Sequence, residues 1–110
     1  MPIFITQGRF TSKGVEGLLN KPEDRTKAVE ALMKGIGGKL LNYYVTTGEY
    51  DFMIIAEGSS EQNIIAALLA ASSTGTVTDL RTVTAITAAD AKSVYEKAQS
   101  MRANFQPAGA

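Results

Sequence analysis

The chain has 110 residues, of which 45% are hydrophobic and 20% are charged, values that are ordinary for one globular domain. Its 11 Lys and Arg residues balance 11 Asp and Glu residues. No global field therefore attracts nucleic acid or an anionic membrane surface. The absence of Cys and His excludes thiol nucleophiles, disulfides and histidine acid–base chemistry, and it removes the commonest zinc ligands.

The sequence also argues against a bound cofactor and against association with a membrane. Carboxylates are the remaining metal ligands, and none have the spacing of a calcium loop, so we expect no metal and no other cofactor. The opening MPIFITQGRF lacks the basic start and long apolar run of a signal peptide. The longest weakly polar run, residues 64–71, is too short to span a bilayer. We expect a cytoplasmic protein that binds neither membrane nor nucleic acid.

The first third of the chain predicts a strand and a helix. Residues 2–10 are rich in β-branched and aromatic side chains and precede the turn signal TSKG, which is typical of a strand. Val15, Leu18 and Leu19 predict a short helical turn at best. A longer helix is predicted to begin at Pro22 and to end in a run of glycines. Its apolar residues, at three- and four-residue spacing, are Ala28, Val29, Leu32, Met33 and Ile36.

The middle of the chain predicts a hairpin and a second helix. Residues 39–47 and 50–57 are two strands joined at Gly48–Glu49, a spacing typical of a short β-hairpin. Ser59 opens the helix, with Gln62 three residues later completing a capping box. The apolar stripe of this helix is Ile64, Ile65, Leu68 and Leu69.

The last third predicts a strand, a helix and a tail. Residues 76–86 are rich in Thr and Val and form the fourth strand. Thr87, followed by Asp90, caps a third helix. Residues 104–110 are expected to be an irregular tail. The apolar residues of the third helix are Ala91, Val94, Tyr95, Ala98 and Met101.

The order of these elements predicts the fold class. Strand, helix, strand, strand, helix, strand is the split βαβ, or ferredoxin-like, arrangement: an α+β fold with helices on one face of a four-stranded antiparallel sheet. Its spatial strand order is fourth, first, third, second. The whole chain, residues 1–110, is expected to form one such domain with an additional C-terminal helix.

The predicted third strand is apolar on both faces. Phe52, Ile54 and Ala56 alternate with Met53 and Ile55. The helices of a ferredoxin-like sheet cover one face only, so the other needs a second cover. We expect a second copy of the chain, in a two-fold dimer that stacks sheet on sheet. The alternative is that the third helix folds over the open face within one chain.

Several segments resemble the GYD-domain family of small bacterial proteins. They are TTGEYDFMII, PIFITQGRFTSKG, GGKLLNYY and TAIT, and the resemblance covers roughly residues 2–95. The family's Gly-x-Tyr-Asp turn corresponds to Gly48, Tyr50 and Asp51. Gln7 and Gly8 depart from the pattern, where two apolar residues are expected. The family is similar to the dimeric α/β-barrel proteins, so the resemblance implies a homodimer. Those relatives include cofactor-free monooxygenases, isomerases, ligand-sensing domains and proteins without known activity, which leaves function open.

The turn contains the candidate site. Gly48 supplies the positive φ that a tight hairpin requires. Tyr50 either packs across the strands or contacts a ligand. Antiparallel pairing brings Arg9, Asp51, Asp79 and Arg81 toward one sheet end. They form either cross-strand salt bridges that fix the register or the polar end of an apolar cavity between sheet and partner. The candidate ligand-binding residues are Arg9, Tyr44, Tyr50, Asp51 and Arg81.

Three classes of function fit this sequence. The first is a homo-oligomer that binds a small apolar or aromatic molecule between the sheets of a dimer. Such a protein could be a cofactor-free monooxygenase or isomerase with Asp51 as base and Arg9 or Arg81 beside a developing oxyanion. The second is a structural ring or shell protein without catalysis, assembled through its Ala-rich second helix. The third is a regulatory module whose partner is another protein.

Overall fold

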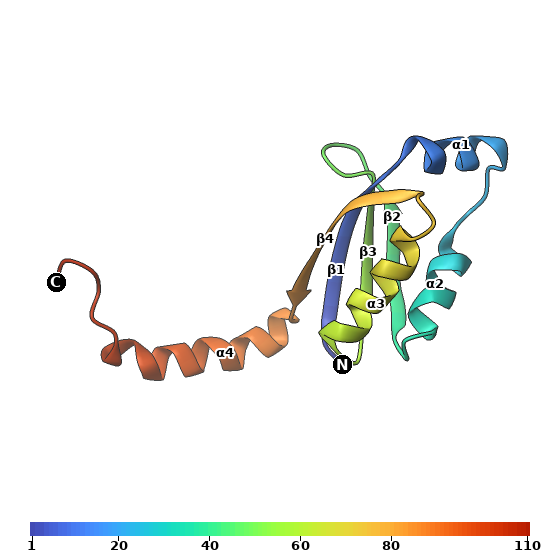
Figure 1. Ribbon diagram of the computed structural model, residues 1–110. Helices are drawn as coiled ribbons and strands as arrows, with labels where there is room; N and C mark the ends of the chain where they lie inside the picture. The colour runs from blue at the N-terminus through green and yellow to red at the C-terminus, as the bar shows by residue number, and fades with distance from the viewer.

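Four strands form one antiparallel sheet, and the helices between the strands lie on one side of it (Figure 1). The computed structural model describes residues 1–110. The elements in chain order are β1 (Ile3–Phe10), α1 (Ser12–Asn20), α2 (Thr26–Lys34), β2 (Lys39–Val45), β3 (Phe52–Glu57), α3 (Glu61–Ser72), β4 (Val77–Ala85) and α4 (Ala88–Met101), followed by a 3₁₀ turn (Arg102–Asn104).

The strand order is β2-β3-β1-β4, which confirms the predicted ferredoxin-like order and the α+β class. The covered face of the sheet contributes Phe4, Phe52, Ile54 and Ala56 to the core, where they pack with side chains from α2 and α3. Thr6 is also buried there, and its hydroxyl pairs with the Thr82 hydroxyl at 2.8 Å, so this polar pair is satisfied.

The segment after β1 is a nine-residue helix, α1, so the prediction of a short turn at best was wrong. The Thr11 hydroxyl caps it by accepting from the Gly14 N–H at 3.1 Å, and donates to the Gly75 carbonyl at 2.6 Å. Gly14 is buried, and a Cβ there would clash with the Thr76 carbonyl oxygen. The cap and this close backbone approach hold the helix against the residues just before β4.

Helix α2 begins at Thr26, four residues later than the predicted start at Pro22. The Asp24 carboxylate accepts from both the backbone N–H and the hydroxyl of Thr26, at 2.9 and 2.6 Å. This Asx-type arrangement satisfies donors of the first turn, so the acidic residue precedes the helix instead of lying within it.

Helix α3 begins one residue later than predicted: Ser60, not Ser59, accepts from the Asn63 N–H at 3.1 Å. Two of the four predicted stripe residues are wrong, because Ile65 and Leu69 are 55% and 65% exposed. Since α3 is apolar nearly all round, the sequence could not tell its inner face from its outer one. The inward residues are Ile64, Ala67 and Leu68.

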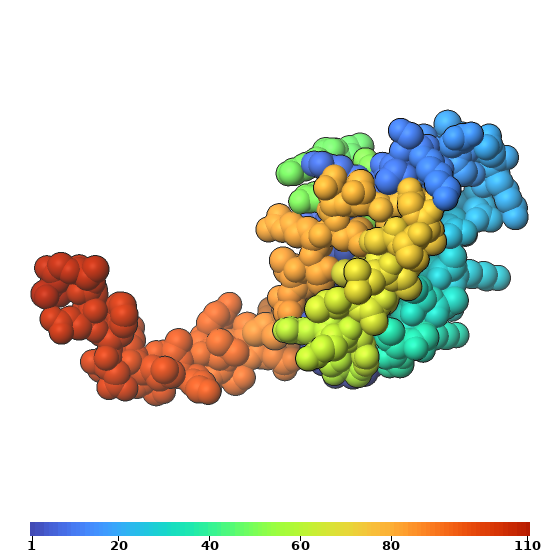
Figure 2. All heavy atoms as spheres, viewed as in Figure 1, coloured from blue at the N-terminus to red at the C-terminus, as the bar shows by residue number.

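Helix α4 extends away from the sheet (Figure 1). Its predicted cap is confirmed, with the Thr87 hydroxyl accepting from the Asp90 N–H at 3.0 Å. Residues 86–110 project from the body as an arm (Figure 2), and the molecule measures 60 × 32 × 21 Å. The arm leaves the second face of its own sheet uncovered. The alternative prediction, in which the C-terminal helix (α4) folds over this face within one chain, is therefore wrong. No helix combines the length and apolarity needed to cross a bilayer.

Candidate functional site

The loop between β2 and β3 contains the Gly-Glu-Tyr-Asp sequence. Gly48 has a φ of 95°, in the left-handed region that Gly adopts without steric cost. Thr46 closes the loop: its N–H donates to the Asp51 carbonyl and its hydroxyl donates to the Tyr50 carbonyl, both at 2.8 Å. The loop is therefore held by its own backbone and one hydroxyl.

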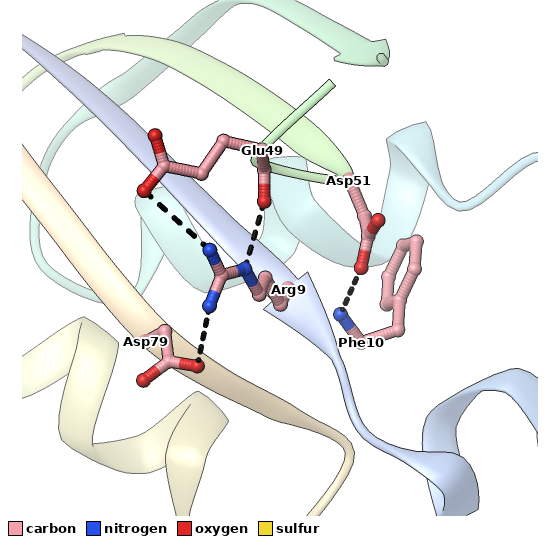
Figure 3. Close-up of polar contacts among 5 residues, drawn as sticks. All are labelled: Arg9, Phe10, Glu49, Asp51 and Asp79. Atoms are coloured by element: carbon pink, nitrogen blue, oxygen red, sulfur yellow. Dashed lines mark hydrogen bonds and ion pairs between the residues drawn. The ribbon is translucent and has the colours of Figure 1, made fainter. Parts of the chain in front are cut away.

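Asp51 binds the end of β1 (Figure 3). Its carboxylate accepts from the Phe10 N–H at 2.9 Å, and its own N–H donates to the Gly8 carbonyl at 2.8 Å. These two bonds extend the contact between β1 and β3 beyond the paired residues Gly8 and Phe52. The Asp51 carboxylate thus accepts a hydrogen bond from the backbone and forms no ion pair with Arg9, although cross-strand salt bridges were one prediction for these residues.

Arg9 joins the loop to β4 (Figure 3). Its Nε donates to the Glu49 carbonyl at 2.7 Å, and its terminal nitrogens lie 3.5 Å from the Glu49 carboxylate and 3.3 Å from the Asp79 carboxylate. The guanidinium carbon lies 5.4 Å from the centre of the Tyr50 ring, a cation–π distance. Sequence reasoning missed Glu49, although its place beside Gly48 in the loop was a usable signal.

A β-bulge places Asp79. Gln7 pairs with Arg81 and Arg9 pairs with Thr78, so β4 has one extra residue opposite Gly8. Asp79 adopts a φ of 52°, a left-handed conformation that Asp tolerates better than most residues.

Gly8 is also required by packing. A Cβ at this position would lie 2.5 Å from side-chain atoms of both Leu80 and Phe52. The bulge and this packing give a physical reason for Gly8, where the family pattern led us to expect an apolar side chain.

The other two predicted ligand-binding residues lie elsewhere. Tyr44 pairs with Met53, Met53 with Gln7, and Gln7 with Arg81, so Tyr44 and Arg81 end one row across the sheet. This row belongs to the face opposite the core. The structure therefore brings Arg9, Tyr50, Asp51 and Asp79 to the loop and β-bulge, but it sets Tyr44 and Arg81 at the two edges of the sheet.

We call the uncovered side of the sheet the open face. The register places apolar residues at its centre, with Ile5 between Ile55 and Val83. Val83 and Tyr44 are 44% and 51% exposed. The apolar residues of the open face are Ile3, Ile5, Tyr44, Met53, Ile55, Val83 and Ala85. A patch of this kind on a sheet usually marks an interaction surface.

Two grooves lie on the helical side. One, of about 490 Å³, is open to solvent beside α1 and lined by residues that include Val15 and Leu19. The other, of about 190 Å³, lies between α2 and β2, next to Asp24, Arg25 and Tyr43. Asp51 lines neither groove. No group of three or more acidic side chains converges on a point where a metal ion could bind.

Two pKa values are perturbed near the second groove. The hydrogen bonds from Thr26, first from its hydroxyl and then from its backbone N–H, lower the pKa of Asp24. Burial raises the pKa of Tyr43, an effect that the nearby Arg25 charge opposes and the Asp24 charge reinforces. Asp24 supports the start of α2 through these hydrogen bonds, and Tyr43 packs against the core.

The outer surfaces of α2 and α3 differ in character. Helix α2 exposes charged side chains, and Lys34 lies 3.8 Å from Glu30. No charged residue occurs from 62 to 78, which includes most of α3. We define the α3 outer face as the exposed residues Ile65, Ala66, Leu69 and Ala70. A helix that is apolar all round normally has partners on both sides.

Comparisons with known proteins identify a family and one relative. Residues 4–95 match the model of the GYD domain family. Over 90 residues the chain is 31% identical to a protein of Thermus thermophilus described as glutamine synthetase and cystathionine beta-lyase binding protein. That match covers 82% of this chain and 94% of the Thermus protein. No solved structure gives a significant match.

Proposed function

This chain belongs to the GYD domain family, and we propose that it is a non-catalytic, homo-oligomeric module that binds a metabolic enzyme through the α3 outer face. The partners proposed are a glutamine synthetase and a cystathionine beta-lyase, by analogy with the description of the Thermus protein. This proposal corresponds to the third function class considered from the sequence, a regulatory module whose partner is another protein.

One observation carries the proposal: the α3 outer face is apolar, uncharged and exposed, next to a charged α2. Ile65 and Leu69 are separated by one helical turn and lie 55% and 65% exposed. Large exposed side chains in an uncharged surrounding are typical of the centre of a protein interface.

The polar groups of the loop support binding over catalysis. Asp51 accepts from a backbone N–H, and Arg9 is engaged by Glu49, Asp79 and the Tyr50 ring. The cofactor-free reaction considered from the sequence requires a substrate proton within hydrogen-bond reach of Asp51 and a donor beside the developing oxyanion. Asp51 is not among the residues that line the two grooves described above.

Surface plasmon resonance with each purified enzyme immobilised tests the proposal. The unsubstituted chain should bind at least one of them saturably. Leu69→Lys should weaken that binding by about tenfold or more, because it places an unpaired charge in an apolar contact. Ala31→Lys adds the same charge to the exposed side of α2 and should bind as the unsubstituted chain does. Equal loss in both variants, or no binding by any, would refute the proposal.

A second candidate rests on the open face. Its apolar centre, formed by Ile55, Ile5 and Val83, lies next to the row that Tyr44 and Arg81 end, a composition that suits a small apolar or aromatic ligand enclosed between the sheets of two copies. A cofactor-free monooxygenase or isomerase would additionally use Asp51. Native mass spectrometry of freshly purified protein separates these alternatives: a dimer that retains a small molecule favours the ligand-binding candidate. Large rings would favour a structural assembly.

A further inference from the structure

Helix α4 has an apolar stripe that is exposed beyond the first turn of the helix. Ala91, in the first turn, is buried, whereas Val94, Tyr95 and Met101 are 52%, 69% and 54% exposed. A 14-residue helix is only marginally stable in water by itself, because most helices in proteins depend on packing of an amphipathic face. The stripe of α4 therefore requires a surface to lie on.

The same chain offers such a surface. The exposed part of the α4 stripe runs from Val94 to Met101 and spans about 10 Å at the helical rise. On the open face, Met53 and Glu57 bound the rows that contain Ile5, Ile55 and Val83, a span of about 13 Å at the strand rise. The exposed part of the stripe thus fits within the length of these rows.

Exposed area indicates that the cover comes from outside the chain. The chain exposes 7744 Å², whereas a compact monomer of 11.7 kDa exposes about 5,900 Å². The excess, about 1,900 Å² per chain, is within the range that each partner buries in an obligate homodimer. The radius of gyration, 17.9 Å, likewise exceeds the roughly 13 Å of a compact chain of this length.

The short connection between β4 and α4 favours packing of α4 on a second copy of the chain over packing on its own sheet. Only Ile86 and Thr87 separate β4 from α4, and Thr87 is extended, with φ −67° and ψ 156°. Its hydroxyl caps the helix, and α4 leads away from the sheet directly after this short joint (Figure 1). Short hinges of this kind favour the exchange of an element between identical chains.

We propose that two copies exchange their C-terminal arms, so that the α4 stripe of each packs on the open face of the other. In such a two-fold dimer the α4 stripe of each chain contacts the open face of the other, so both surfaces are covered in both chains. The inference rests on the proposed self-association and specifies its contacts. It is independent of the α3 outer face.

Cross-linking between single-cysteine variants tests this exchange, because the chain has no native Cys. The test mixes Ala98→Cys, at the centre of the α4 stripe, with Val83→Cys on the open face, and adds a short bismaleimide. A linked species of twice the chain mass should form. In the control, Ser100→Cys, on the opposite side of α4, replaces Ala98→Cys. It should react about tenfold more slowly, because only bound neighbours meet at high effective concentration.

Sedimentation of the full chain gives an independent measurement. The unsubstituted protein should be a dimer at micromolar concentration, and Ala98→Glu should raise its dissociation constant by about tenfold or more, since the arm would place a charge on an apolar surface. Ser100→Glu should not change it.

Three results would overturn the exchange. A monomer whose Val83→Cys/Ala98→Cys double variant links only within one chain would show that the arm folds back on its own sheet. A dimer in which Val83→Cys links to itself while Ala98→Cys and Ser100→Cys react equally slowly would show stacked sheets with free arms. That second result would leave self-association intact. A monomer with no linking above the Ser100→Cys control would refute both.

Discussion

Asp51 stabilises the junction of β1 and β3 by accepting one hydrogen bond from the Phe10 N–H, at 2.9 Å. Asp51→Ala should cost roughly 1–3 kcal/mol, because it leaves a part-buried N–H without its acceptor. Asp51→Asn retains a carbonyl oxygen in the same place and should cost less. Urea denaturation of the three proteins measures these differences. Equal stability of Asp51→Ala and the unsubstituted chain would show that the bond contributes nothing.

Gly48 is required for its backbone conformation alone. Nothing lies within 4 Å of a Cβ built at this position, while its φ is 95°. Gly48→Val should therefore destabilise the fold by about 1 kcal/mol or more through strain, without any clash. Gly48→Asn should cost less, because Asn tolerates left-handed conformations. A thermal melt of Gly48→Val that coincides with that of the unsubstituted chain would contradict this.

The start of α2 should respond to acid through Asp24. Its pKa is lowered in the folded chain by the Thr26 hydrogen bonds, the hydroxyl first. A lowered folded pKa means that the contribution to stability is present above the unfolded value, 3.8, and is lost as pH falls through the folded value. The stability difference between the unsubstituted chain and Asp24→Ala should therefore be largest at neutral pH and fade below about pH 4. Urea denaturation midpoints of both proteins from pH 7 to pH 2.5 measure this difference. A difference that stays constant over this range would show that the Asp24 carboxylate does not cause the pH dependence.

The two faces of α3 should behave differently under substitution. Ile64 is 4% exposed in the core, so Ile64→Ala should cost about 2–4 kcal/mol through the lost contacts and the cavity left behind. Leu69 is 65% exposed, so Leu69→Lys should change stability by less than about 0.5 kcal/mol. Chemical denaturation compares them directly. A large loss for Leu69→Lys would mean that this side chain supports the fold of the isolated chain.

At the scale of elements, local chemistry made some features predictable. The cap of α4 depends on Thr87 and Asp90 only, and the strand order follows from the sequence of element types. Helix α1 was underestimated because its support comes from contacts far along the chain, between Gly14 and the Thr76 carbonyl. The faces of α3 were not predictable, since apolar residues surround the helix and only tertiary packing distinguishes them.

Some contacts of the candidate site could also be predicted from the sequence, and others could not. Antiparallel pairing correctly indicated that Arg9 and Asp79 lie near one another, and they form an ion pair at 3.3 Å. The partners of Asp51 could not be predicted, because its carboxylate binds a backbone N–H that no residue pattern identifies. The β-bulge that places Asp79 depends on the packing of Leu80 and Phe52 against Gly8, which is a three-dimensional property.

At the scale of the whole molecule, the open face should govern association. Met53 lies in the row between Tyr44 and Gln7 on that face. Met53→Lys should shift the protein toward monomer, because a charge there must be desolvated on association. Light scattering over a micromolar concentration series measures the shift. Lys27→Glu, on the exposed side of α2, is the control and should leave the oligomer unchanged.

We propose that the chain binds a protein partner through the α3 outer face and that the Asp51 carboxylate has a structural role. The most direct test is calorimetric titration of purified glutamine synthetase, and in parallel cystathionine beta-lyase, with Leu69→Lys and Asp51→Asn alongside the unsubstituted chain. We expect saturable binding by the unsubstituted chain, unchanged affinity in Asp51→Asn, and a loss of affinity of about tenfold or more in Leu69→Lys. Loss of binding in Asp51→Asn with full affinity in Leu69→Lys, or no binding to either enzyme, would contradict it.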